Sequence, residues 1–240
     1  MKQFKTVNDN RLDTICSYCG ENMADTRDHV PSKILLEEPY PENLPVVPCC
    51  SKCNQGFSLD EEYLACLIEC VICGSIEIEK LSRQKIKIIL CKKEALRMQL
   101  SNSIIYENDN TFFIPEIKRL KNVFIKLAKG HFKYENSEQI IDEPTHWNYK
   151  PLFLMTLQER KNFFEMKATG LLPEIGSRAM IKSVTNNNNM LQTFVEWNIV
   201  QQNVYHYAVS INPIIVRMII WNYLAVEVGW EDISCFLIER

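Results

Sequence analysis

Two pairs of cysteines have the spacing most typical of metal binding in this chain. Two residues separate Cys16 from Cys19, and two separate Cys50 from Cys53. Four thiolates complete a tetrahedral zinc shell without water, so the pairs predict a structural Zn²⁺ site. Cys49 adjoins the second pair, but the spacing to Cys53 selects Cys50 as the ligand.

The segment between and just after the pairs carries side chains suited to hydrolysis. Asp28 and His29 are adjacent, Asn43 lies before the second pair, and Asn54 follows its last cysteine. Neutral imidazole accepts a proton near pH 7. Carboxylate and amide oxygens are ligands for hard cations such as Mg²⁺. Two short strand candidates, at 27–30 and 43–47, are expected to position these groups.

The order of these features is cysteine pair, strand, loop, strand, cysteine pair and helix. This order, over about residues 12–65, resembles the ββα-metal fold of the HNH endonucleases. The resemblance implies hydrolysis of phosphodiester bonds, with His29 as the general base that deprotonates an attacking water. It also implies that Asn43 orients the imidazole, and that Asp28 and Asn54 bind a catalytic divalent cation.

One position departs from the family pattern. Asn54 stands where the family name has its second histidine, which makes the chain an H-N-N variant. Because an amide oxygen is a poorer ligand than imidazole for softer ions, we expect Mg²⁺ or Mn²⁺ at the catalytic site. DNA is the expected substrate, and RNA stays open because no residue pattern addresses a 2′-hydroxyl.

A non-catalytic zinc-finger module that binds nucleic acid or protein is the alternative. Such a module needs the four cysteines but has no use for the set of Asp28, His29 and Asn54. Three further cysteines, Cys66, Cys70 and Cys73, share one helical face. We interpret them as core residues rather than a second metal site, because buried free cysteines are common.

The predicted fold class is α+β in two domains. Residues 1–65 form the zinc-stapled module, and residues 66–240 form an accessory domain that is mainly helical with a small β-hairpin or sheet. Helices are expected from residue 58, broken at Gly74, and over 115–131, where apolar residues share one face and lysines the other. We expect the accessory domain to supply specificity, oligomerisation or partner docking.

Two more elements are expected in the accessory domain. Strand-like runs on either side of residues 201–203 predict a hairpin. An apolar helix is expected to begin at Pro213. Basic residues that precede these elements are candidate contacts for nucleic-acid phosphates, or alternatively a solvated helix face: Arg83, Lys85, Lys87, Lys92 and Lys93.

The charge balance limits how the protein meets nucleic acid. The formal net charge is -3, whereas free-standing DNA-binding proteins are usually basic. We therefore expect a regulatory partner protein, with a homo-oligomer as a further option. No signal peptide or membrane span is evident, which predicts a cytoplasmic protein. The layout resembles nucleases of bacterial mobile elements and anti-phage defence.

Overall fold

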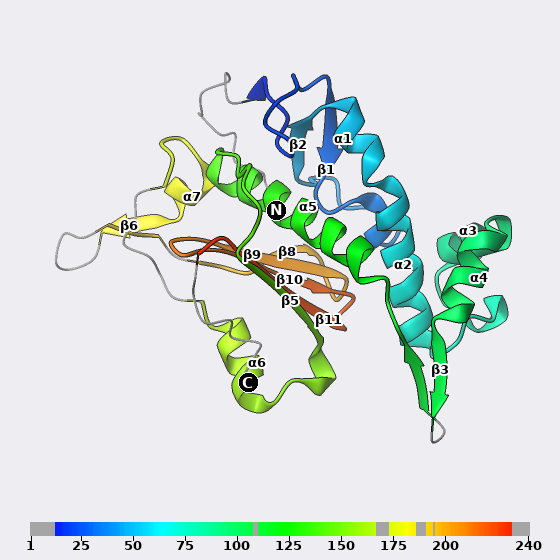
Figure 1. Ribbon diagram of the computed structural model, residues 1–240. Helices are drawn as coiled ribbons and strands as arrows, with labels where there is room; N and C mark the ends of the chain where they lie inside the picture. The colour runs from blue at the N-terminus through cyan, green and yellow to red at the C-terminus, as the bar shows by residue number, and fades with distance from the viewer. Residues whose placement is uncertain (1–12, 108–109, 167–172, 186–190, 194, 232–240) are drawn as a thin grey trace. The chain divides into compact units, whose positions relative to one another are not determined.

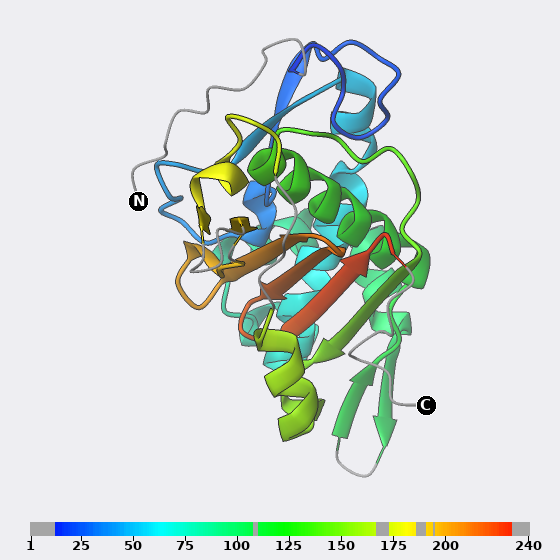
Figure 2. The ribbon, with the colours of Figure 1, turned by 90° about the vertical axis from the view of Figure 1, so that its left-hand side faces the viewer.

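The computed structural model describes most of the chain: residues 13–107, 110–166, 173–185, 191–193 and 195–231. Helices and sheets are mixed, so the fold is α+β (Figures 1 and 2). The chain divides into two compact units, residues 1–56 with 124–240, and residues 57–123. The boundary expected at residue 65 lies inside helix α2 (Ser58–Cys73).

The elements follow one another in a mixed order. Those up to the long helix are β1 (Thr26–His29), η2 (Lys33–Leu35), β2 (Val46–Cys49), α1 (Ser51–Gly56), α2, η3 (Ile78–Lys80), α3 (Gln84–Lys92), α4 (Glu94–Asn102), β3 (Ile104–Glu107), β4 (Asn110–Phe113) and α5 (Ile117–Asn136). Those after it are β5 (His146–Pro151), η4 (Leu152–Leu154), α6 (Leu157–Phe164), α7 (Arg178–Ile181), β6 (Ser183–Thr185), β7 (Leu191–Thr193), β8 (Asn198–Gln201), β9 (Tyr205–Ile211), β10 (Ile214–Ile220) and β11 (Leu224–Gly229).

A small antiparallel hairpin carries the first group of predicted site residues. β1 pairs with β2 in a register that places Thr26 opposite Cys49 and His29 opposite Val46. Helix α1 begins two residues after β2 ends. The prediction of two strands followed by a helix is confirmed, with β2 starting later in the chain than expected.

A five-stranded antiparallel sheet of order β5-β11-β10-β9-β8 dominates the rest of the first unit. Helix α5 crosses one face (Figure 1), where His131 stacks on Tyr207 with ring centroids 3.8 Å apart. Phe163 of α6 packs on the other face beside Ile219 and Ala225. Both faces of the sheet are therefore covered, which explains why β10 and β11 are almost wholly buried.

The expected helix after Pro213 is wrong, and the sheet of the accessory region is larger than the small hairpin or sheet expected. The segment forms the hairpin β10–β11 instead. An apolar run buried on both faces lacks the period-2 alternation of a half-exposed strand, so periodicity does not separate it from a buried helix. The hairpin predicted around residues 201–203 is confirmed as β8–β9.

The turn between β10 and β11 and the end of β8 both contact the loop that joins β1 to β2. Trp221 and Asn222 have φ values of 56° and 45°, a left-handed conformation that costs energy for residues other than glycine. The indole Nε1 of Trp221 donates to the carbonyl of Leu35 at 3.0 Å. Gln201 makes two further hydrogen bonds, both of 2.9 Å, to the backbone of Glu37. The loop is thus fixed on the sheet.

Helix α5 begins near the predicted position but passes through Gly130 and ends at Asn136. The face opposite its apolar residues is partly covered as well, because Lys126, Lys129 and Lys133 are buried. A Cβ atom at Gly130 would lie 2.7 Å from the side chain of Val30. Glycine is needed here because the residue after β1 packs directly on the helix backbone.

The second unit contains three helices and the β3–β4 hairpin. Gly74, in the left-handed conformation, ends α2 where the sequence predicted a break. Cys66 and Cys70 are buried in α2 and Cys73 is half-buried, consistent with a packing role. Among the described residues, every helix is too short or too polar to cross a bilayer.

Candidate functional site

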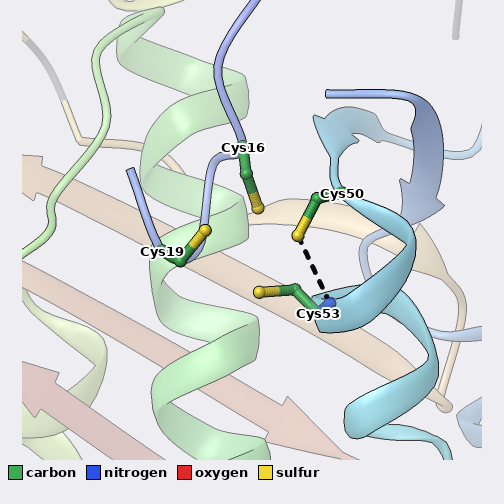
Figure 3. A group of neighbouring side chains, drawn as sticks. All are labelled: Cys16, Cys19, Cys50 and Cys53. Atoms are coloured by element: carbon green, nitrogen blue, oxygen red, sulfur yellow. Dashed lines mark hydrogen bonds between the residues drawn. The ribbon is translucent and has the colours of Figure 1, made fainter. Parts of the chain in front are cut away.

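The four predicted cysteine ligands come together in the first unit (Figure 3). Cys16 and Cys19 precede β1, while Cys50 and Cys53 lie at the start of α1. Their sulfur atoms all lie within 4.8 Å of one another. A tetrahedral ion with metal–sulfur bonds of about 2.3 Å separates its sulfurs by about 3.8 Å. If the four sulfur atoms move slightly toward one another, the cluster can hold a structural metal such as zinc.

Backbone and amide N–H groups surround these sulfurs. The amides of Tyr18 and Cys53 lie 3.5 Å and 3.4 Å from the sulfurs of Cys16 and Cys50. Desolvation is the largest influence on Cys19, but hydrogen bonds from the Asn22 amides and the Glu21 backbone outweigh it and lower its pKa to about 6. Burial raises the pKa of Cys16 instead. Four adjacent thiolates repel one another, and a bound cation would balance their negative charges.

Two hydrogen-bonded contacts hold the cysteine pairs on the β-hairpin. Ser17 donates to the carbonyl of Pro48 from both its backbone N–H and its hydroxyl, at 3.0 and 2.7 Å. The carboxylate of Asp25 accepts from the amide and hydroxyl of Ser51, both at 2.7 Å, at the first residue of α1. An acid in this position satisfies a free helix amide. Ser17 thereby ties the first cysteine pair to β2, and Asp25 ties the start of β1 to the start of α1.

His29 ends β1 and is half-buried. Burial is the main cause that lowers its pKa below 6.5, and the positive charge of Lys33 acts in the same direction. The imidazole is therefore neutral near pH 7 and can accept a proton. This protonation state is the one that the predicted general base requires.

Asp28 is buried, and its carboxylate is engaged. Its Oδ2 atom accepts from the Tyr18 hydroxyl at 2.6 Å and pairs with Nζ of Lys126 at 2.5 Å. These contacts involve one carboxylate oxygen, and Oδ1 is the oxygen that can serve a cation. Adjacent residues of a strand direct their side chains to opposite faces. Asp28 and His29 therefore project from different sides of β1.

The two asparagines lie apart from each other. Nδ2 of Asn54 is 3.4 Å from Oγ1 of Thr26 and 3.5 Å from the carbonyl of Arg27. Because Thr26 and Asp28 share a face of β1, the amide of Asn54 approaches the face that carries Asp28. Asn43 is exposed in the loop before β2 and lines a cavity of the first unit.

The predicted phosphate-binding residues lie in the second unit. Arg83 is only 5% exposed, and its backbone N–H donates to Glu69 at 2.8 Å. A buried guanidinium cannot track a phosphate backbone in this conformation. Lys85 and Lys87 are half-buried, while Lys92 and Lys93 are exposed. Lys93 pairs with Glu62 at 2.7 Å.

Sequence reasoning missed Tyr18 and Lys126, the two residues that hold Asp28. Tyr18 lies between the first two cysteines, where it has the appearance of a variable spacer. Lys126 lies on the polar side of α5, which an amphipathic pattern assigns to solvent. The one sequence signal is Gly130, one helical turn after Lys126, because glycine inside a helix indicates a close packing contact.

Comparisons of the chain with protein-family models, curated proteins and solved structures gave no match. The geometry above defines an α+β protein with a four-cysteine cluster that can hold a structural metal.

Proposed function

We propose that this chain is a metal-dependent endonuclease of the HNH type, which hydrolyses phosphodiester bonds in DNA. In this proposal Zn²⁺ occupies the four-cysteine cluster and His29 is the general base. The observation that carries it is the local order of β1, β2 and α1 around the cluster. A histidine with a lowered pKa ends the first strand, and Asn54 follows the last cysteine on the helix.

The reaction needs three contributions from the chain. His29 takes a proton from water, whose oxygen forms a bond to phosphorus as the bond to the leaving oxygen breaks. Asp28, through Oδ1, and Asn54 would hold a hard cation such as Mg²⁺ or Mn²⁺. Two oxygen donors suit such an ion, because Mg²⁺ usually keeps several waters. When bound, the cation neutralises charge that develops on the phosphate.

The proposal requires the candidate groups to act on one phosphate near the end of β1. Asp28 and Asn54 share one side of this strand, and His29 leaves it on the other side at its last residue. A phosphodiester that lies across the strand end reaches both sides. Asn43 supports the imidazole in this arrangement by resemblance to the family.

A non-catalytic zinc module that binds nucleic acid or protein is the second candidate. The ion pair between Asp28 and Lys126 favours it, because the pair gives Asp28 a structural role that needs no cation. The two candidates differ in their requirement for His29, which a binding module can lose without effect.

Plasmid cleavage with Mg²⁺ or Mn²⁺ separates the two candidates. Wild type is expected to nick the plasmid, and His29→Ala to lose at least about 100-fold of the rate, because a general base contributes about 10²–10⁴-fold. His206→Gln, a half-buried histidine on β9, is the matched control and retains activity. Equal nicking by wild type and His29→Ala that resists EDTA contradicts the nuclease proposal. The proposal is also contradicted if wild type cleaves neither DNA nor RNA.

We further propose that a partner protein controls the nuclease, since the net charge of -3 disfavours high affinity for DNA by the chain alone. Size-exclusion chromatography with the products of neighbouring genes tests this proposal. Co-elution together with a change in the rate of plasmid cleavage supports it, and cleavage by the isolated chain that these products leave unchanged counts against it.

A further inference from the structure

A cavity with a volume of about 430 Å³ lies in the first unit, lined by described residues. Its walls come from the loop before β2, the end of α5, helix α7 and strands β8 and β9. This volume falls within the range of about 300–1,000 Å³ typical of sites for small organic groups. The cysteine cluster and the strand that carries His29 are not among its walls, so the cavity is separate from the candidate catalytic groups.

One wall of the cavity is a flat stack of a cation on an aromatic ring. The guanidinium carbon of Arg178 lies 3.8 Å from the centroid of the Tyr134 ring. Its Nη1 atom donates to the Tyr134 carbonyl at 3.1 Å, which fixes the guanidinium in place. Unpaired nucleobases stack on aromatic rings and on guanidinium planes, and both groups line this cavity.

The second cation in the cavity is already neutralised. Nζ of Lys182 pairs with Oε2 of Glu135 at 2.9 Å and donates to Oδ1 of Asn198 at 3.2 Å. The other oxygen of Glu135 accepts from the Tyr207 hydroxyl at 2.7 Å. This closed network makes the cavity a poor site for a free phosphate or another small anion.

Two carboxylates at the cavity have no such partners. Glu42 and Glu196 are exposed, and their carboxylates make no hydrogen bond or ion pair among the described residues. Together with Glu135, they outnumber the two cations, Arg178 and Lys182. The charge therefore favours a flat, uncharged group that presents N–H donors to a carboxylate.

We propose that this cavity binds an unpaired guanine base of the nucleic-acid substrate. The base would stack at the Arg178–Tyr134 wall, while its N1–H and N2 amino group donate to a rim carboxylate. Adenine lacks an N–H at N1, and thymine lacks an exocyclic amino group. Asn43 links the two regions, because it lines the cavity and its loop leads into β2, the partner of β1. The inference rests on the proposed nuclease function and adds a base preference to it.

Binding of labelled DNA hairpins tests the proposal without any cleavage. The full chain with zinc and the His29→Ala substitution is titrated with hairpins that differ at one unpaired loop position, guanine or adenine. Fluorescence anisotropy is expected to give about 10-fold tighter binding for guanine, because hydrogen bonds to charged groups discriminate at least this well. Competition by guanosine monophosphate alone distinguishes the base from its nucleic-acid context.

Matched charge-neutral variants locate the preference. Glu42→Gln with Glu196→Gln is expected to abolish the difference between guanine and adenine. Glu79→Gln with Glu165→Gln removes the same charge from exposed positions outside the cavity and is expected to keep it. Both double variants raise general affinity for DNA equally, so only the ratio between hairpins reports on the cavity.

Three results overturn the inference: equal affinity for the two hairpins, an unchanged preference in the Glu42/Glu196 variant, or binding of guanosine monophosphate without any preference between hairpins. The outcome is independent of the plasmid assay. A preference for guanine by a chain that never cleaves removes the nuclease proposal and keeps the cavity. Cleavage without a base preference keeps the nuclease proposal and removes the proposed role of the cavity.

Discussion

Nζ of Lys126 on α5 lies 2.5 Å from Oδ2 of Asp28 on β1, and the lysine side chain is only 1% exposed. The pair joins the small β1–β2 hairpin to the helix that covers the sheet. A buried ion pair costs desolvation energy to form, but removal of one partner strands the other charge. Asp28 therefore depends on Lys126 for its position.

Lys126→Met is expected to lower the free energy of unfolding by about 3–5 kcal/mol, because Asp28 keeps a buried charge without its counterion. Asp28→Asn alone is expected to strand the lysine in the same way. The double variant is expected to cost less than the sum of the two single changes. Urea unfolding of the four proteins gives the coupling energy, and a coupling near zero contradicts the structural role of the pair.

Gly130→Ala tests the close contact between α5 and the end of β1. The new methyl carbon would lie 2.7 and 2.9 Å from the two γ-carbons of Val30. Overpacking of this kind costs about 1–3 kcal/mol. Val30→Ala in the same chain is expected to recover stability, since it removes the clashing atoms. Gly56→Ala, where a Cβ meets no atom within 4 Å, is the control and keeps its Tm.

Metal removal is expected to destabilise the first unit. Zinc content by mass spectrometry should be one ion per chain, and Cys19→Ser should reduce it to near zero. We expect this variant to lower the Tm by about 10 °C, the shift for a loss of about 3–4 kcal/mol in a chain of this size. Cys91→Ser, an exposed cysteine outside the cluster, serves as control. Full zinc content in Cys19→Ser contradicts the assignment.

The stability of the protein is expected to fall in mild acid because of His131. Burial holds the pKa of this fully buried histidine well below its ordinary 6.5. Below pH 6.5 the unfolded chain binds a proton that the folded chain refuses, so stability is complete above this pH and decreases as the pH falls.

The measurement is urea unfolding between pH 7.5 and 5.5 for wild type and His131→Phe. The variant keeps a ring to stack on Tyr207 but loses the 2.9 Å hydrogen bond to Tyr205. It should be less stable at pH 7.5, and its slope below pH 6.5 should be smaller by about 1.4 kcal/mol per pH unit. Parallel slopes for the two proteins contradict the assignment to His131.

The sequence predicted those parts of the structure whose signal is local. The Cys-x-x-Cys spacings located the four-cysteine cluster, and the turn around residues 201–203 located the β8–β9 hairpin. The prediction of a helix after Pro213 was wrong because β10 and β11 are buried on both faces, so their apolar residues do not alternate with polar ones. The prediction also failed at Lys126, since a lysine that pairs with an aspartate far away in sequence looks the same as one in solvent.

The β1–β2 hairpin with its cysteine cluster and the sheet that supports it are separated in the chain by residues 57–123, although they belong to one compact unit. A growing polypeptide therefore produces Asp28 and His29 long before Lys126, Gln201 and Trp221 emerge to fix them. During synthesis at about 5–20 residues per second, the hairpin waits for several seconds without its support. If the proposed nuclease activity requires that support, a nascent or truncated chain carries the reactive residues but stays silent.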